Sequence, residues 1–289
     1  APDPNTVIVD PREGGQKLLQ FLQRRLDLPP SLLHRWIRTG QVRINGGRAK
    51  PFGLVAAGDS VRLPPFALGM SRRSKATGGQ ASPEQEHEPR QRTQALPPAP
   101  RPLQKDGDLW VFCKPAGLPT HPGTGHEDSL SSRLAARAGD APFKPTPVHR
   151  LDKDTSGILL VAASFSVLRE LTTALRERRM KKEYLAVFTG TPAKEARGTW
   201  EDYLVKDGKT NTSRVTGKQD RLAKKAVLSY EILDWKKDRG LAKIQLGTGR
   251  HHQIRVQMAH HGMPLWADGK YKKKEELLEE EQGTAIGLC

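Results

Sequence analysis

Cysteine is almost absent from the sequence. The two cysteines, Cys113 and Cys289, lie far apart and match no zinc-binding or CxxC spacing, so neither a disulfide framework nor a cysteine-based metal site is indicated. No apolar run approaches the ~20 residues that span a bilayer, and the first residues lack the charged and apolar regions of a signal peptide. We therefore expect no membrane segment and a reducing, cytoplasmic setting.

Acidic residues are also scarce relative to basic ones. The chain has 48 Lys and Arg against 32 Asp and Glu, a formal net charge of +16. Such an excess attracts polyanions, although basic surfaces also serve solubility or membrane association. Nucleic acid is the leading candidate partner.

The length and one change in composition predict the domain organisation. A chain of 289 residues can hold two domains. Residues 66–106 are rich in Pro, Gln, Arg, Ser and Gly, with few large apolar side chains, which is typical of a flexible segment. We expect a small domain in residues 1–66, a flexible linker in 67–106 and a larger domain in 107–289.

The first segment predicts two helices and a small sheet. Apolar residues recur at helical spacing in residues 18–26 and 32–37, with Ser31 placed to cap the second helix and Gly40 to end it. Asn45-Gly46 is a strong hairpin signal, and residues 61–63 are expected to form a closing strand.

The strings GGQKLLQFLQRRL, SLLHRWIRTGQVRINGGRAKP and AGDSVRLP together resemble the S4 RNA-binding domain. The resemblance implies that the second helix and the adjoining hairpin grip the RNA backbone, as clustered guanidinium groups facing phosphates would favour. The residues expected to bind RNA are Arg24, Arg35, Arg38 and Arg43. A solvated basic face without a ligand is the alternative.

The third segment alternates strands and helices without a regular βαβ rhythm. This favours an α+β fold with a mixed, largely antiparallel sheet flanked by helices. The expected strands cover residues 109–112, 157–162, 181–189, 226–232 and 242–246, and the expected helices lie near residues 167–175 and 252–261.

Four motifs carry the chemistry of this segment. Asp152 stands in a polar turn before an apolar strand, a position that alone is more typical of a cap or turn. The full string HRLDKDTSG, however, resembles the central signature of RluA-type pseudouridine synthases. Three further segments match the same family in the same order: CKPAGLPTHP, KEYLAV and TGRHHQIRV. With the S4-like part, the RluC-like subgroup that acts on large-subunit ribosomal RNA is the nearest match.

The resemblance implies an enzyme that isomerises uridine in structured RNA without a cofactor. Asp152 would be the nucleophile, attacking the sugar C1′ or uracil C6, or the reaction would begin with proton abstraction at the sugar. Arg255 would pair with Asp152 and keep it ionised against the effect of burial, and Tyr184 would stack on the extruded base. His149 would order the loop by hydrogen bonding. The residues expected to hold the RNA backbone are Arg150, Lys182 and Arg250.

Other readings stay open at this stage. A non-catalytic RNA-binding or ribosome-assembly protein could keep the same fold, and a nucleoside or glycoside hydrolase could use Asp152 with a second carboxylate, for which Asp154 is the near candidate. A metal site is not expected, because the adjacent pairs His251-His252 and His260-His261 match no HExxH or Cys/His pattern. We expect a monomer.

The end of the chain departs from the family pattern. GMPLWADGKY, residues 262–271, still resembles the family's GxPIxxDxxY stretch, but the charge block KKKEELLEEEQG that follows predicts an exposed helix or disorder. Residues 285–289 coincide with the start of a further family strand. We expect either a truncated chain or a sheet that closes differently.

Overall fold

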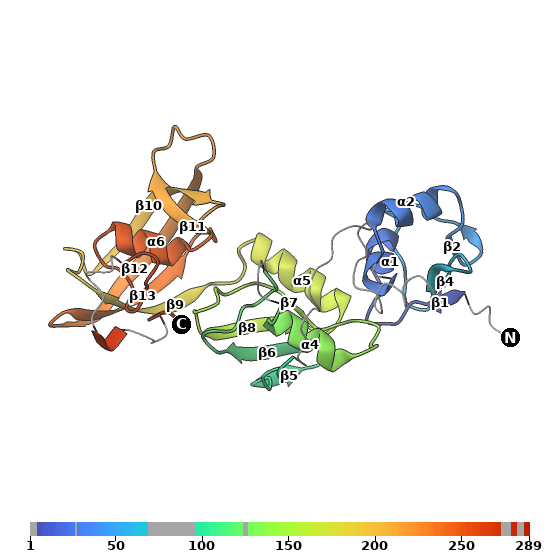
Figure 1. The fold of residues 1–289 in the computed structure, drawn as a ribbon, viewed down its shortest axis with the longest axis horizontal. Coiled ribbons are helices and arrows are strands. Elements are labelled where there is room, and N and C mark those ends of the chain that lie inside the picture. Colours follow the sequence, from blue (N-terminus) through green and yellow to red (C-terminus); the bar gives the residue numbers. More distant parts are fainter. Residues whose placement is uncertain (1–4, 27, 69–95, 124–126, 273–278, 282–285) are drawn as a thin grey trace, which may run out of the picture.

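The computed structural model describes residues 5–26, 28–68, 96–123, 127–272, 279–281 and 286–289. These residues form three sheets that follow one another along the longest axis of the molecule (Figure 1). Every strand pairing given for them is antiparallel. The predicted α+β fold with a largely antiparallel arrangement is confirmed. Of the described helices, none is long and apolar enough to cross a membrane.

The N-terminal unit contains two helices, α1 (Leu18–Leu26) and α2 (Pro30–Arg38), on a four-stranded sheet. The strands lie in the order β1 (Thr6–Ile8), β4 (Ser60–Arg62), β2 (Arg43–Ile44) and β3 (Gly47–Arg48). Their common core contains Leu18, Phe21, Leu22, Leu33, Trp36, Ile37 and Val61. The amphipathic spacing and the Asn45-Gly46 turn thus predicted α1, α2, the β2–β3 hairpin and β4, whereas β1 was not predicted.

One detail of this unit was predicted wrongly. Ser31 does not cap α2, because the helix already begins at Pro30 and its N-cap is Pro29, which makes no side-chain hydrogen bond. Proline suits the first helical position, where an N–H would have no partner within the helix. The assignment of the unit as an S4 domain stays a prediction.

The central sheet has the order β5 (Gln104–Asp106), β6 (Leu109–Lys114), β8 (Gly157–Ala162) and β7 (Thr146–Pro147). Two helices, α4 (Leu130–Ala138) and α5 (Phe165–Arg176), accompany it (Figure 1). Its core contains Phe112, Leu118, Leu130, Leu134, Leu151, Leu159 and Val161.

The predicted linker overlaps this sheet. Residues 69–95 of the linker lie outside the described residues, but residues 104–106 pair with β6 as strand β5. The boundary at residue 107 is therefore placed a few residues late. The three residues of β5 are all exposed, so their strand conformation comes from pairing with β6 and leaves no alternation of apolar side chains in the sequence.

The C-terminal sheet has the order β11 (Thr212–Thr216), β10 (Arg197–Asp207), β12 (Lys224–Lys236), β13 (Arg239–Leu246) and β9 (Glu183–Thr189). Helix α6 (Gln253–His260) contacts β10 and β11. The core of this part contains Ala186, Phe188, Leu228, Tyr230, Ile244, Ile254, Met258 and Leu265. Strands β9, β12 and β13 were predicted, whereas β10 and β11 were not.

The charge block after Tyr271 is partly described. Residues 273–278 lie outside the described residues, and Glu279–Glu281 form a short 3-10 helix, η2. Lys272 and Glu281 are buried and form an ion pair with Nζ–Oε1 at 2.7 Å. The prediction of an exposed segment is thus wrong for these two residues, because an opposite charge compensates each when it leaves water.

Residues 286–289 lie beside the edge strand β9. Leu185 donates its N–H to the Cys289 carbonyl at 2.7 Å and accepts from the Cys289 N–H at 3.0 Å, and Leu288 forms a bridge with Ala186. These residues therefore join the edge of the C-terminal sheet through an isolated bridge and not as a regular strand.

We predict that Gly190→Ala destabilises the protein by about 2 kcal/mol or more. Gly190 follows β9 with φ +89°, and an added Cβ would lie 2.5 Å from the Gly262 carbonyl oxygen, so both the backbone conformation and a backbone atom oppose the methyl group. Thermal denaturation measures the effect. The matched control is Gly208→Ala, where a Cβ would meet nothing within 4 Å; equal melting temperatures for the two variants would contradict the prediction.

Candidate active site

Asp152 lies in the loop between β7 and β8, and that loop is anchored on both sides. Thr155 N–H donates to the Asp152 carbonyl at 3.2 Å and closes the turn. The preceding residue, Leu151, is buried, and its N–H and carbonyl are both hydrogen-bonded to Thr120 Oγ1, at 3.1 and 2.8 Å. The carboxylate is therefore presented from a fixed backbone.

Lys114, the last residue of β6, also holds this loop in place. Its fully buried ammonium group donates to three backbone carbonyls, Pro115 at 2.9 Å, Leu118 at 2.8 Å and Lys153 at 3.0 Å. Burial lowers the pKa of Lys114 to about 8. The lysine ties the turn after β6 to the residue that follows Asp152. Sequence reasoning placed Lys114 in a motif but gave it no role, because its partners are backbone atoms that leave no trace in the sequence.

Arg255, on α6, forms a buried bidentate ion pair with Asp268. Arg255 Nε lies 2.7 Å from Asp268 Oδ2, and its terminal nitrogen lies 2.6 Å from Oδ1. The two side chains are 5% and 0% exposed. In the described part of the chain Arg255 forms its ion pair with Asp268 and not with Asp152, using two of its five N–H donors, and it acts on Asp152 through its charge. Asp268 lies in the GMPLWADGKY stretch, which was the available signal for it.

The charge state of Asp152 follows from this arrangement. Burial raises the pKa of Asp152, while Arg255 and Arg150 lower it and Asp268 raises it further. The net direction is upward. The expectation that a neighbouring cation reverses the effect of burial is therefore not met, because burial outweighs the opposing charges of Arg255 and Arg150, and Asp268 adds a smaller upward contribution.

A chain of hydrogen bonds orients a neutral imidazole toward Asp152. Ser213 N–H donates to Tyr271 Oη at 2.8 Å, and Tyr271 Oη lies 2.8 Å from His252 Nδ1. Burial, then Arg255, lowers the pKa of His252 to about 2, so the ring is neutral. His252 Nε2 lies 3.9 Å from Asp152 Oδ2. With the Tyr271 proton donated to Nδ1, Nε2 carries the ring proton and presents it to the carboxylate.

Tyr184, on β9, lies in the same site as Asp152. Burial, together with the charge of Asp152, raises the pKa of Tyr184, so the phenol stays protonated. Tyr184 also packs against both the central and the C-terminal hydrophobic cores. Its ring is thus held between the two sheets.

These side chains surround one cleft of about 480 Å³. Asp152, Tyr184 and Arg255 all line it, as do His252 and the three other residues predicted to hold the RNA backbone, Arg150, Lys182 and Arg250. Burial lowers the pKa of Lys182. His149 accepts a hydrogen bond from Leu160 N–H at Nε2, 3.2 Å, which confirms that it orders the loop. A cation-lined cleft with one carboxylate and one phenol can hold an anionic ligand that carries a planar ring.

The remaining predicted residues lie in the N-terminal unit and outside the cleft. Arg35, Arg38 and Arg43 are exposed on α2 and β2. Arg24 differs from them, because its guanidinium lies 5.1 Å from the Phe143 ring and 5.6 Å from the Phe165 ring. It therefore contacts the central part of the molecule.

The amino-acid sequence is similar to those of known proteins. Residues 108–260 match the family model described as RNA pseudouridylate synthase. Ribosomal large subunit pseudouridine synthase C of Pasteurella multocida is 34% identical over 96% of this chain and 79% of its own length. The protein of the same name from Escherichia coli K12 is 33% identical over 95% of this chain and 82% of its own.

Solved structures share the fold. Human RNA pseudouridylate synthase domain containing 4 superimposes with a TM-score of 0.54 at 23% identity, over 65% of this chain and 80% of its own. Human RNA pseudouridylate synthase domain containing 1 gives the same TM-score at 24% identity, over 64% and 74%.

We predict that Asp268→Asn destabilises the protein by about 3 kcal/mol or more, because it leaves the buried charge of Arg255 without its counterion. Chemical denaturation measures the difference. Asp238→Asn is the matched control, since the Asp238 side chain is 56% exposed and its removal should change stability little. If both variants unfold at the same denaturant concentration as the unaltered protein, the ion pair between Arg255 and Asp268 does not stabilise the fold.

Proposed function

Because the chain belongs to the RNA pseudouridylate synthase family, we propose that it converts uridines of large-subunit ribosomal RNA to pseudouridine. The observation that carries the proposal is the convergence of Asp152, Tyr184 and Arg255 on one cleft, although they come from a loop, a strand and a helix. The names of the relatives, which act on the large ribosomal subunit, support the choice of RNA.

The reaction needs a carboxylate that acts as nucleophile or base, and it needs no cofactor. The C1′–N1 bond of uridine breaks, the uracil turns, and a C1′–C5 bond forms; the proton leaves C5 and N1 gains one, so atoms balance. Asp152 can start the reaction by attacking the sugar C1′, by attacking uracil C6 or by taking a proton from the sugar. The carboxylate accepts no side-chain hydrogen bond within the described part of the chain, and it faces the cleft. It is therefore available to react.

The cleft fits an extruded nucleotide. Its volume of about 480 Å³ lies in the range of ordinary small-molecule sites, roughly 300–1,000 Å³. Chemistry on a base in folded RNA needs the nucleotide out of its stack, held against an aromatic ring. Tyr184 supplies that ring, and its phenol is protonated. Arg150, Lys182 and Arg250 supply positive charge for the flanking phosphates.

The N-terminal unit would add affinity through the backbone of the RNA. Its exposed guanidinium groups on α2 and β2 are suited to phosphate contacts. We place the reaction in the cytoplasm and expect a monomer, since one chain carries all the residues of the cleft.

A hydrolase that cuts the same glycosidic bond is disfavoured. Such an enzyme ordinarily uses a second carboxylate within about 5 to 9.5 Å. Asp154, the near candidate, does not line the cleft, and Asp268 is occupied by Arg255.

We predict that Asp152→Asn lowers the rate by about 10⁴-fold or more, the scale on which loss of a reacting group acts. Because burial raises the pKa of Asp152, its ionised form costs folding free energy above that pKa, and the neutral Asn should raise the melting temperature at neutral pH. The same shift predicts that the rate of the unaltered enzyme falls as the pH drops through a value above ~4, the ordinary pKa of Asp.

Carbodiimide-based mapping of pseudouridine in ribosomal RNA, with and without the gene, measures the activity and its target. Asp154→Asn, in the same loop, is the matched control and should keep the signal. Release of free uracil would support the hydrolase instead, whereas RNA of unchanged mass fits isomerisation. Modification that persists in Asp152→Asn would end the proposal for this cleft.

We also predict that replacing Arg35, Arg38 and Arg43 together by Ala raises KM and leaves kcat unchanged. Each lost phosphate contact should reduce the slope of log affinity against log salt concentration by about 0.7–0.9. The slope of the triple variant should therefore be smaller by about 2 to 3. Arg197→Ala, an exposed arginine on β10, is the control. An unchanged slope in the triple variant would show that these residues do not meet phosphate.

A further inference from the structure

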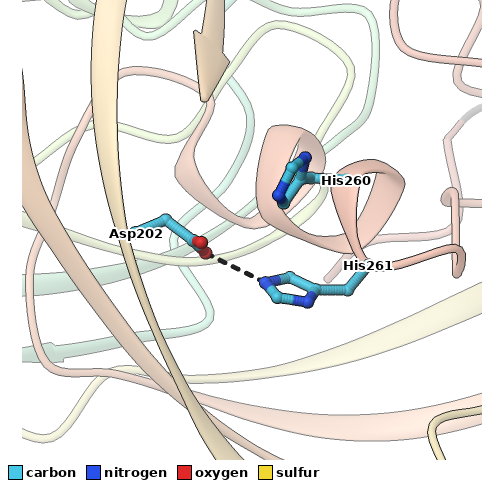
Figure 2. Close-up of side chains that lie close together, drawn as sticks. All are labelled: Asp202, His260 and His261. Atoms are coloured by element: carbon cyan, nitrogen blue, oxygen red, sulfur yellow. Dashed lines mark hydrogen bonds and ion pairs between the residues drawn. The ribbon is translucent and has the colours of Figure 1, made fainter. Parts of the chain in front are cut away.

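Three potential metal ligands meet at the C-terminal end of α6. Asp202 comes from β10, and His260 and His261 come from the helix end; their ligand atoms all lie within 4.8 Å of one another. Figure 2 shows both imidazoles extending from the helix toward Asp202. We propose that this cluster, the Asp202 cluster, binds a borderline divalent cation of the zinc class. None of its three residues lines the cleft that holds Asp152.

Neighbouring side chains hold two of the ligands in place. Asp202 Oδ2 accepts a hydrogen bond from Gln257 Nε2 at 2.7 Å and lies 3.0 Å from His261 Nε2. Gln257 is fully buried. The His261 ring stacks on Trp200, with ring centres 4.1 Å apart and planes at 10°. Such partners fix the orientation of a ligand set before the metal arrives.

The distances suit a tetrahedral ion after a small adjustment. With zinc–nitrogen and zinc–oxygen distances of about 2.0–2.2 Å, two ligand atoms on one zinc ion lie about 3.3 Å apart. The Asp202–His261 contact of 3.0 Å is close to that value. The ring of His260 must move toward the other two ligand atoms; its side chain is exposed, and the movement would change its edge-to-face contact with the His261 ring, whose centre lies 5.1 Å away. The proton on His261 Nε2 shifts to Nδ1 when the ion binds, so the ring stays neutral.

The donor set selects the class of cation. Imidazole nitrogens favour Zn²⁺, Ni²⁺ and Cu²⁺ over Mg²⁺ and Ca²⁺, which take oxygen ligands. Three protein ligands leave a position for water. A bound ion would join the end of α6 to β10, and α6 carries Arg255 near its other end. Sequence spacing predicted no metal, because the two histidines match no motif and Asp202 lies 58 residues before His260.

Calorimetric titration of the untagged full chain with Zn²⁺ tests the proposal. His260→Ala and Asp202→Asn should each weaken binding by on the order of 10- to 100-fold. His34→Ala, which removes an imidazole from α2, should leave it unchanged. Circular dichroism establishes that the variants are folded. If His260→Ala and Asp202→Asn bind Zn²⁺ as tightly as the unaltered chain, the proposal is overturned.

Tryptophan fluorescence gives a second measurement that a merely structural role of these residues would not produce. Ni²⁺ bound at the Asp202 cluster would quench Trp200, which stacks on His261. The quenched fraction should vanish in both His260→Ala and Trp200→Phe, while Trp200→Phe should still bind Zn²⁺ by calorimetry. Quenching that persists in Trp200→Phe would place the ion elsewhere and contradict the proposal.

Discussion

The buried pair of Arg255 and Asp268 is the constraint on which the rest of the site depends. Removing two charges from water is costly, and only a bidentate geometry such as the observed 2.6 and 2.7 Å contacts recovers much of that cost. The pair fixes the first turn of α6 against the segment after Leu265. It also contributes to the electrostatic field at Asp152: Arg255 lowers the pKa of that carboxyl, and Asp268 raises it by a smaller amount. Burial outweighs these charges, so the pKa of Asp152 lies above its ordinary value.

The cleft exists only because two separate sheets are held together. Asp152 lies in a loop between two strands of the central sheet, whereas Tyr184 and Arg255 belong to the C-terminal part. Residues 286–289 connect them: the Leu288 carbonyl accepts from Ser156 N–H at 3.3 Å, near Asp152, and the next residue pairs with Leu185 on β9. The Tyr184 ring adds a contact with both cores. Weakening these contacts would alter the distance between the Asp152 carboxylate and the Tyr184 ring without changing either side chain.

The sequence carried local information well and long-range pairing poorly. Amphipathic spacing predicted α1 and α2, and the motifs predicted that Asp152, Tyr184 and Arg255 share a cleft. What it missed depends on partners distant in the chain. β5 is a strand because β6 pairs with it, Lys114 is buried because three carbonyls accept its protons, and Arg255 faces Asp268 because the segment after α6 turns back. Each of these contacts depends on the tertiary fold, since the residue type alone allows several partners.

The basic residues of the N-terminal unit divide into two groups, and the division gives the unit an orientation. Arg24 packs over Phe143 and Phe165, and the carbonyl of Arg12 accepts from Phe165 N–H at 2.7 Å. The side of α1 is thus used for docking on the central part. Arg35, Arg38 and Arg43 are exposed instead. An RNA held by these three would be fixed relative to the cleft by the docked helix, so affinity at one end of the molecule would also position the nucleotide at the other.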